Sequence, residues 1–305
     1  MMKRMISLVL GLVFFLTSSA YATLDIIWVS EADSPASDFA SGQNVAPALQ
    51  ADATPWDQLW VDLLRAQGYN VDYRLGSQPG EGYWNELDAD KIAALNAADR
   101  VIISRGASSG GYDDGDEPSQ WNSVTTPMIL MNPYFTRSSH WKWFNTTGMA
   151  ENGDAPLMDG APPFDVVFKD LDVLDETVGT GHTSFIRAKD AGNGLAVALV
   201  DDAFPTAAEG GIDNLAGSIW LALWDEGVEF YDGAGQTAGG RRLYFAGGTR
   251  EGDVEGGYFW GAGMYNLTAD GETIFLAAVA TIPEPATIAL LGLGGLVLLS
   301  IRRKR

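Results

Sequence analysis

The sequence predicts an α/β fold built on a largely parallel, doubly wound sheet, with extra strands in the second half of the chain. Two observations lead to this prediction. Short apolar runs of strand length alternate with segments whose apolar residues recur at helical spacing. Their order is strand, helix, strand, helix, strand, strand, which requires crossover connections. Such connections join parallel strands and place helices over both faces of a sheet.

The first 22 residues are predicted to be a secretory signal peptide that does not belong to the fold. Lys3 and Arg4 precede an apolar stretch at 6–16, and Ala20-Tyr21-Ala22 offers a cleavage site with small residues at its ends. We therefore expect three regions: a signal peptide at 1–22, a secreted domain at 23–281 and a C-terminal segment at 282–305.

The first half of the domain supplies the alternating elements. Thr54-Pro55-Trp56-Asp57 is expected to open a helix, with Thr54 as the cap, and Gly68 to end it. Asp88 is expected to cap a second helix that runs to Ala98. The buried face of the first helix is predicted to consist of Trp56, Leu59, Trp60, Leu63 and Leu64. The expected strands are 24–29, 71–73, 101–104 and 128–131.

The second half predicts further strands and a last helix at 268–280. The expected strands are 165–168, 195–200, 219–223, 228–231 and 242–246. Neither an internal repeat nor a long linker divides this part of the sequence, so a single domain is expected.

The C-terminal segment combines three ordered features: Pro283-Glu284-Pro285, an apolar stretch at 286–301, and a basic cluster at 302–305. As a helix, the apolar stretch would be about 24 Å long, which spans a hydrocarbon core of about 30 Å only marginally. The basic cluster would stay in the cytoplasm and place the preceding domain outside.

These features resemble the PEP-CTERM sorting signal of Gram-negative bacteria. The resemblance implies recognition by an exosortase, processing near Pro283-Glu284-Pro285, and release or attachment at the cell surface. It also implies membrane association through the C-terminal helix before processing, and exopolysaccharide as a partner class. It carries no information about what the domain itself does.

Composition excludes several functions. The two targeting segments hold six of the 19 basic residues and one of the 40 acidic ones, so 13 positive charges face 39 negative ones in the domain, a net charge of −26. This charge argues against nucleic acid as a partner. The chain has no cysteine, which excludes disulfides, thiolate metal sites and a cysteine nucleophile.

The candidate ligand-binding crevice lies where two expected strands end. Ligands bind α/β sheets outside the carboxyl ends of their strands. The loop after 101–104 and the loop after 128–131 are rich in polar side chains. The candidate residues are Arg105, Ser108, Ser109, Tyr112, Asn132 and Arg137.

The same loops leave catalytic and cation-binding alternatives open. Residues 106–110 read G-x-S-x-G, which could make Ser108 a nucleophile with His140 or His182 as its base, although no helix is expected to follow this turn. A calcium site is conceivable at Asp113, Asp114, Asp116 and Glu117, whose spacing is not that of an EF-hand. No histidine pair has zinc-binding spacing.

Tryptophans near the crevice raise a carbohydrate hypothesis. Sugar rings stack on aromatic side chains, and Trp141 and Trp143 follow Arg137 closely in the sequence. They are candidates for lining a binding site, and packing in the core is the alternative.

The domain also resembles the class I glutamine-amidotransferase-like fold, a flavodoxin-like sheet, and in particular its trehalose-utilisation (ThuA-like) branch. The resemblance rests on the α/β order, the Ser104-Arg105 loop, the strand at 242–245, and Asn266-Leu267-Thr268 before the final helix. The amidotransferase nucleophile is a cysteine, which is absent here, so amidotransferase activity is not implied.

We therefore expect an exported, surface-sorted protein with a ligand-binding or structural α/β domain that needs no cofactor. The alternatives are an extracellular serine hydrolase acting on a glycan or ester, and a cation-dependent adhesive domain.

Overall fold

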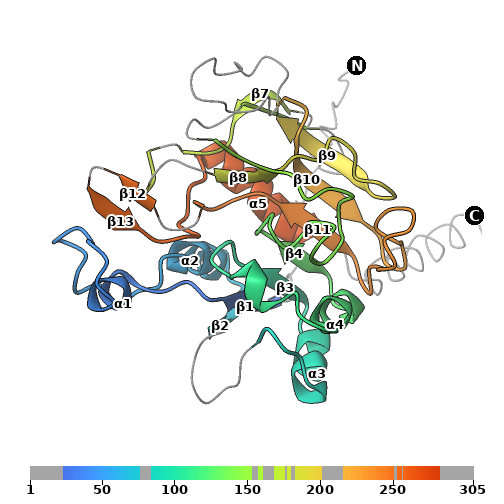
Figure 1. Ribbon diagram of the computed structural model, residues 1–305, viewed down its shortest axis with the longest axis horizontal. Coiled ribbons are helices and arrows are strands. Elements are labelled where there is room, and N and C mark those ends of the chain that lie inside the picture. Colours follow the sequence, from blue (N-terminus) through green and yellow to red (C-terminus); the bar gives the residue numbers. More distant parts are fainter. Residues whose placement is uncertain are drawn as a thin grey trace, which may run out of the picture.

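The computed structural model describes residues 23–75, 84–152, 157–160, 168–175, 177–179, 183–200, 216–250, 253–255 and 257–281 (Figure 1). The predicted signal peptide, the C-terminal sorting segment and His182 lie outside these residues. Within them, no helix is both long and apolar enough to cross a membrane.

A nine-stranded mixed sheet organises the domain (Figure 1). Five neighbouring strands run parallel, and four more continue the sheet antiparallel. The parallel strands are, in spatial order, β2 (Asn70–Leu75), β1 (Asp25–Ser30), β3 (Arg100–Ile103), β4 (Met128–Leu130) and β11 (Arg242–Phe245). The antiparallel strands are β10 (Ile219–Trp224), β9 (Leu195–Val200), β6 (Leu157–Gly160) and β7 (Phe168–Asp172).

The expectation of a largely parallel sheet therefore holds for only one half. The parallel strands β1 to β4 are separated by helices, as crossover connections require. In the second half, no helix lies between β5 and β11 in the described chain, so strands that are consecutive in the sheet turn back on one another. Extra strands were expected there, but their antiparallel direction was not.

Six helices and two small sheets complete the described structure. The helices are α1 (Pro35–Ala40), α2 (Gln58–Ala66), α3 (Ala89–Ala97), the 3-10 turn η1 (Ser109–Gly111), α4 (Glu117–Ser123) and α5 (Ala269–Thr281). The small sheets pair β5 (Met149–Asn152) with β8 (Thr183–Ile186), and β12 (Asp253–Glu255) with β13 (Tyr258–Trp260).

Most predicted elements are present and one is wrong, while residues 165–167 of the strand expected at 165–168 lie outside the described residues. Residues 228–231 were expected to form a strand but lie in a turn, where a single bridge joins Glu229 to Thr237. The apolar residues of this segment have another use, because Phe230 is buried against the rings of Trp143 and Trp224. The cap at Asp88 is confirmed, since its carboxylate accepts a hydrogen bond from Lys91 N at 2.8 Å.

The start of α2 differs from its prediction. The helix begins at Gln58, after Asp57, so Thr54 does not cap it and Trp56 precedes it. Its buried residues are Trp60, Val61 and Leu64, whereas Leu59 is 61% exposed. The predicted burial of Trp56, Trp60 and Leu64 is confirmed, and that of Leu59 is wrong. The Asp57 side chain makes no hydrogen bond that caps the helix.

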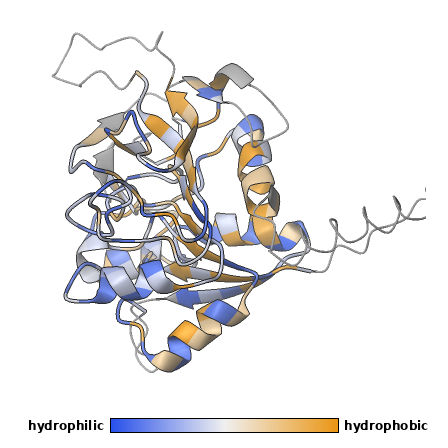
Figure 2. Ribbon diagram, turned by 90° about the vertical axis from the view of Figure 1, so that its right-hand side faces the viewer, coloured by the Kyte–Doolittle hydropathy of each residue, from blue (hydrophilic) through white to orange (hydrophobic). Residues whose placement is uncertain are grey.

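Aromatic side chains fill both faces of the sheet. On one face, Phe245 of β11 meets Trp60 of α2 and Phe275 of α5 at centroid distances of 6.4 and 5.2 Å. On the other face, Tyr244 packs edge-on against Phe144. Figure 2 shows that the helices carry both apolar and polar residues. A helix of this kind can turn its apolar side toward the core and its polar side toward solvent.

Two buried arginines tie strands to the ends of helices. Arg242, at the start of β11, donates from Nη2 to the carbonyls of Asn122 (3.0 Å) and Val124, at the C-terminal end of α4. Arg100, at the start of β3, donates from Nε to the carbonyl of Val279 in α5 at 3.3 Å. The last carbonyls of a helix have no hydrogen-bond donor within the helix. Each arginine, although it belongs to a strand, donates to such carbonyls and so caps the C-terminal end of a helix.

Candidate functional site

The candidate site lies at the carboxyl ends of the parallel strands. The chain passes from β1 outward to β2 and then back across β1 to β3, so the loops after β1 and β3 leave the sheet in opposite directions. In open α/β sheets, a crevice forms at this point. Glu31 follows β1 directly, and Ser104 follows β3.

Asp57 forms a buried polar centre beneath this point. Its side chain is fully buried, and Oδ2 accepts hydrogen bonds from Trp28 Nε1 at 3.0 Å and Ser104 Oγ at 2.5 Å. Oδ1 accepts a hydrogen bond from the Tyr73 hydroxyl at 2.6 Å. The donors come from β1, β2 and the end of β3. Asp57 therefore links three strands, and both of its carboxylate oxygens accept hydrogen bonds from them.

Glu31 lines a small cavity with a volume of about 150 Å³. Its Oε2 accepts a hydrogen bond from Ser108 N at 2.8 Å. Burial raises the pKa of Glu31 above its ordinary value, the Ser108 hydrogen bond opposes this, and the nearby charge of Asp33 raises the pKa further. The other lining residues are Ala32, Asp33, Asp38, Trp56, Gly106, Phe259, Gly261 and Ala262.

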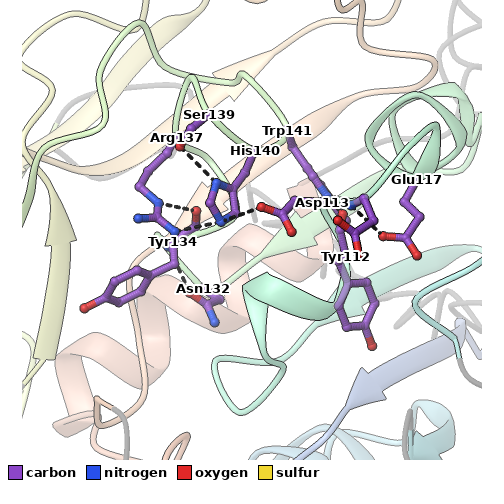
Figure 3. Close-up of polar contacts among 10 residues, drawn as sticks. Tyr112, Asp113, Glu117, Asn132, Tyr134, Arg137, Ser139, His140 and Trp141 are labelled. Carbon is purple, nitrogen blue, oxygen red and sulfur yellow. Dashed lines mark hydrogen bonds and ion pairs between the residues drawn. The ribbon is translucent and has the colours of Figure 1, made fainter.

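Three of the six predicted crevice residues, Arg105, Asn132 and Arg137, meet around Tyr134. Figure 3 shows Asn132 and Arg137 beside it. The guanidinium groups of Arg105 and Arg137 lie over its ring, 5.4 and 5.0 Å from the centroid. Asn132 joins the two loops, because its Nδ2 donates to the carbonyl of Ala107 at 2.6 Å. Arg105 and Asn132 are each only 2% exposed, so their main contacts are internal.

The other three predicted crevice residues, Ser108, Ser109 and Tyr112, differ in exposure and in their contacts. Ser108 is exposed, and its backbone amide binds Glu31. Ser109 begins the turn η1. Tyr112 is fully buried between the rings of Trp121 and Phe135, so the structure gives it a packing position.

His140 forms the densest polar cluster of the site (Figure 3). Its Nε2 lies 2.7 Å from Arg137 Nη2 and 3.1 Å from Asp113 Oδ2, and its Nδ1 lies 3.0 Å from Ser139 Oγ. Burial and the charge of Arg137 lower the pKa of His140, while Asp113 opposes this. Burial and Arg137 thus disfavour the charged imidazolium, and Ser139 is the hydroxyl beside the ring.

The nucleophile turn expected at Ser108 has neither the helix nor the base of a hydrolase elbow. The turn leads into η1, and the next α-helix begins only at Glu117. Both ring nitrogens of His140 contact other side chains, and His182 lies outside the described residues.

Of the two interpretations of Trp141 and Trp143, packing in the core is confirmed and a carbohydrate-lining role is not. Both side chains are fully buried. Trp141 stacks on Trp121 at 5.4 Å, and Trp143 stacks on Phe230 at 5.3 Å. Trp141 packs against α4, and Trp143 also contacts Trp224 of β10.

The acidic turn after η1 is engaged in local contacts. Asp113 faces His140, and Glu117 accepts a hydrogen bond from Asp114 N at 3.0 Å. Across the described ranges, no group of three or more histidine, aspartate or glutamate side chains could hold a metal ion. The calcium alternative therefore gains no support from this turn.

Sequence reasoning missed Glu31, Asp57 and Tyr134. Glu31 was detectable, because it follows the expected strand at 24–29 after a single residue, close to where Arg105 follows the strand at 101–104. Asp57 was assigned to a helix start instead. No sequence pattern indicated that Tyr134 would receive two guanidinium groups.

Comparison with known proteins identifies the C-terminal segment. Residues 281–305 match the PEP-CTERM protein-sorting motif. This motif indicates an exported bacterial protein that is directed to the cell envelope or surface and processed by an exosortase. No curated protein and no solved structure matches the chain, so the amidotransferase-like resemblance of the domain has no support from these comparisons.

Proposed function

We propose that this PEP-CTERM protein presents a non-catalytic, ligand-binding α/β domain at the cell surface or in the extracellular matrix, with exopolysaccharide as its partner. The sorting motif at 281–305 carries the proposal, because it determines where the domain acts. The secretory signal at 1–22 and the C-terminal membrane helix before processing belong to the same proposal.

The chemistry of the crevice supports binding over catalysis. The buried carboxylate of Asp57 is saturated by donors from three strands, and the imidazole of His140 is held among Arg137, Ser139 and Asp113. A general base needs access to the proton that it removes. Asp57 has no such access in this fold.

Replacing Pro283-Glu284-Pro285 with three alanines tests the proposal in the producing bacterium. We expect the variant to remain unprocessed in the membrane fraction, whereas a Thr287→Ala control is processed and displayed like the native protein. Cell fractionation with intact-mass analysis measures both properties. Normal processing and display of the triple-alanine variant would refute the sorting role.

A serine hydrolase remains the second candidate, and one observation favours it. Ser139, His140 and Asp113 form a hydroxyl–imidazole–carboxylate chain with separations of 3.0 and 3.1 Å. If this chain were catalytic, Ser139→Ala would abolish hydrolysis of a chromogenic ester, whereas Ser108→Ala would leave it unchanged. Undetectable hydrolysis by the native protein would eliminate this candidate.

A further inference from the structure

A second and larger cavity lies away from the carboxyl ends of the parallel strands. It has a volume of about 590 Å³, within the usual range of about 300–1,000 Å³ for small-molecule sites. Its walls come from three segments: residues 145–146 before β5, residues 187–193 between β8 and β9, and residues 231–232 between β10 and β11.

The side chains that line this cavity are mostly polar. Amides, carboxylates, a hydroxyl and two cationic groups face the same space, and Tyr231 supplies the aromatic ring. Such a lining does not suit an apolar ligand, whose burial would leave these groups without hydrogen-bond partners. The polar lining side chains are Asn145, Thr146, Arg187, Lys189, Asp190, Asn193, Tyr231 and Asp232.

The walls are held in place by their own contacts. Asn193 Nδ2 donates to the carbonyl of Glu229 at 3.0 Å and to Asp232 Oδ1 at 3.2 Å, which joins two of the segments. Gly192 has φ +62°, and a Cβ there would lie 2.7 Å from both Phe230 O and Tyr231 Cβ. Only glycine permits this approach, so Tyr231 is fixed against the wall.

Two cationic side chains, Arg187 and Lys189, line the cavity together with two acidic ones, Asp190 and Asp232. The side-chain stem of Arg187 lies beside Gly148, where an added Cβ would be 3.3 Å from Arg187 Cβ, and its backbone amide donates to Gly148 O at 3.0 Å. Lys189 follows two residues later, and no carboxylate of the described residues forms an ion pair with it. One oxygen of Asp190 is engaged by Gly192 N at 2.9 Å.

We infer that this cavity binds a short acidic saccharide, a hydroxyl-rich ligand that carries a carboxylate. Arg187 and Lys189 bind the carboxylate, the asparagine and aspartate side chains bind hydroxyls, and the Tyr231 ring packs against the apolar face of a sugar ring. The inference rests on the proposed ligand-binding role and names its ligand class. The domain has a net charge of −26, so the rest of its surface repels such a ligand on average.

Isothermal titration calorimetry tests the inference on the full chain purified in detergent. The probes are a panel of uronate trisaccharides of different linkages, neutral trisaccharides of the same linkages, and acetate. We expect binding of at least one uronate trisaccharide, at least tenfold weaker binding of its neutral counterpart, and no measurable binding of acetate.

Three variants locate the binding. Arg187→Gln, Lys189→Gln and Tyr231→Ala should each weaken uronate binding at least fivefold, whereas Arg241→Gln, a partly exposed arginine outside the cavity, should leave it unchanged. Melting curves verify that each variant is folded. Equal binding of neutral and acidic probes, unchanged binding by the three variants, or no binding of any panel member would overturn the inference. None of these results would affect the sorting test, so the two failures are distinguishable.

Discussion

At the scale of single residues, Asp57 shows how one carboxylate can organise an edge of the sheet. Its three hydrogen bonds reach the side chains of Trp28, Tyr73 and Ser104. Asp57→Ala would leave these buried donors without an acceptor. We expect a loss of about 3–5 kcal/mol in the free energy of unfolding, measured by urea denaturation. Asp62→Ala, on the exposed side of the following helix α2, should change the free energy of unfolding by less than about 0.5 kcal/mol. Similar values for the two variants would contradict the role of Asp57.

Glu31 gives a prediction about pH. Its pKa is raised in the folded protein, chiefly by burial, so ionisation disfavours the folded state. The native protein therefore loses stability as pH rises from the ordinary value of 4.5 through the raised pKa. Glu31→Gln removes this loss, and its side-chain oxygen can still accept from Ser108 N.

We expect Glu31→Gln to raise the melting temperature at pH 7.5 and to have little effect near pH 4. Melting curves followed by circular dichroism at the two pH values measure the difference. Asp62→Asn serves as an exposed control. An equal effect of Glu31→Gln at both pH values would show that ionisation of Glu31 is not the cause.

At the scale of elements, Arg242 connects a strand to a helix. Burial lowers its pKa to about 9, so the guanidinium is charged at neutral pH and needs the carbonyls that surround it. Arg242→Met would remove the guanidinium donor from the Val124 carbonyl and leave the Asn122 carbonyl with only its bond from Gly239 N. We expect about 3 kcal/mol of destabilisation, against less than about 1 kcal/mol for Arg241→Met, whose ion pair with Asp225 is exposed. Denaturant unfolding of both variants provides the comparison, and equal losses would refute the capping role.

Gly271 limits how α5 packs. A Cβ at this position would lie 2.1 Å from the carbonyl oxygen of Val173. Alanine favours an isolated helix over glycine by about 1 kcal/mol, yet we expect Gly271→Ala to destabilise the protein because the helix must move away. Gly110→Ala, where nothing lies within 4 Å, is the control for the melting-temperature measurement. A higher melting temperature for Gly271→Ala would contradict this packing.

Much of the parallel half of the fold was predictable from sequence, because strands such as β1 and β3 are continuous apolar runs between helical segments. The direction of β10 and β9 was not, since a short apolar strand looks the same in parallel and antiparallel sheets. For the candidate site, the carboxyl-end rule located the loops of Arg105 and Arg137. It could not show that Arg105 would be buried or that Asp57 would turn away from its helix, because both depend on contacts between distant segments.

At the scale of the whole molecule, charge is the dominant feature. A net charge of −26 on the domain produces self-repulsion that is relieved by salt. Raising the NaCl concentration from about 0.01 to 1 M shortens the Debye length from about 30 to 3 Å. We therefore expect the melting temperature to rise by several degrees. Calcium chloride at matched ionic strength should have the same effect as NaCl, and a much larger effect of calcium would instead support the cation-dependent alternative.

The position of α5 has a consequence for how the domain would be held at a surface. The helix ends at Thr281, and Ile282 is the single residue between it and Pro283. A flexible spacer of n residues has a reach of about 5–6 Å × √n, so this junction provides almost none. If the chain is attached at the sorting motif, the domain sits directly against its anchor. The range of orientations that the domain can adopt at the surface then depends on the mobility of the anchor, because no flexible spacer separates the two.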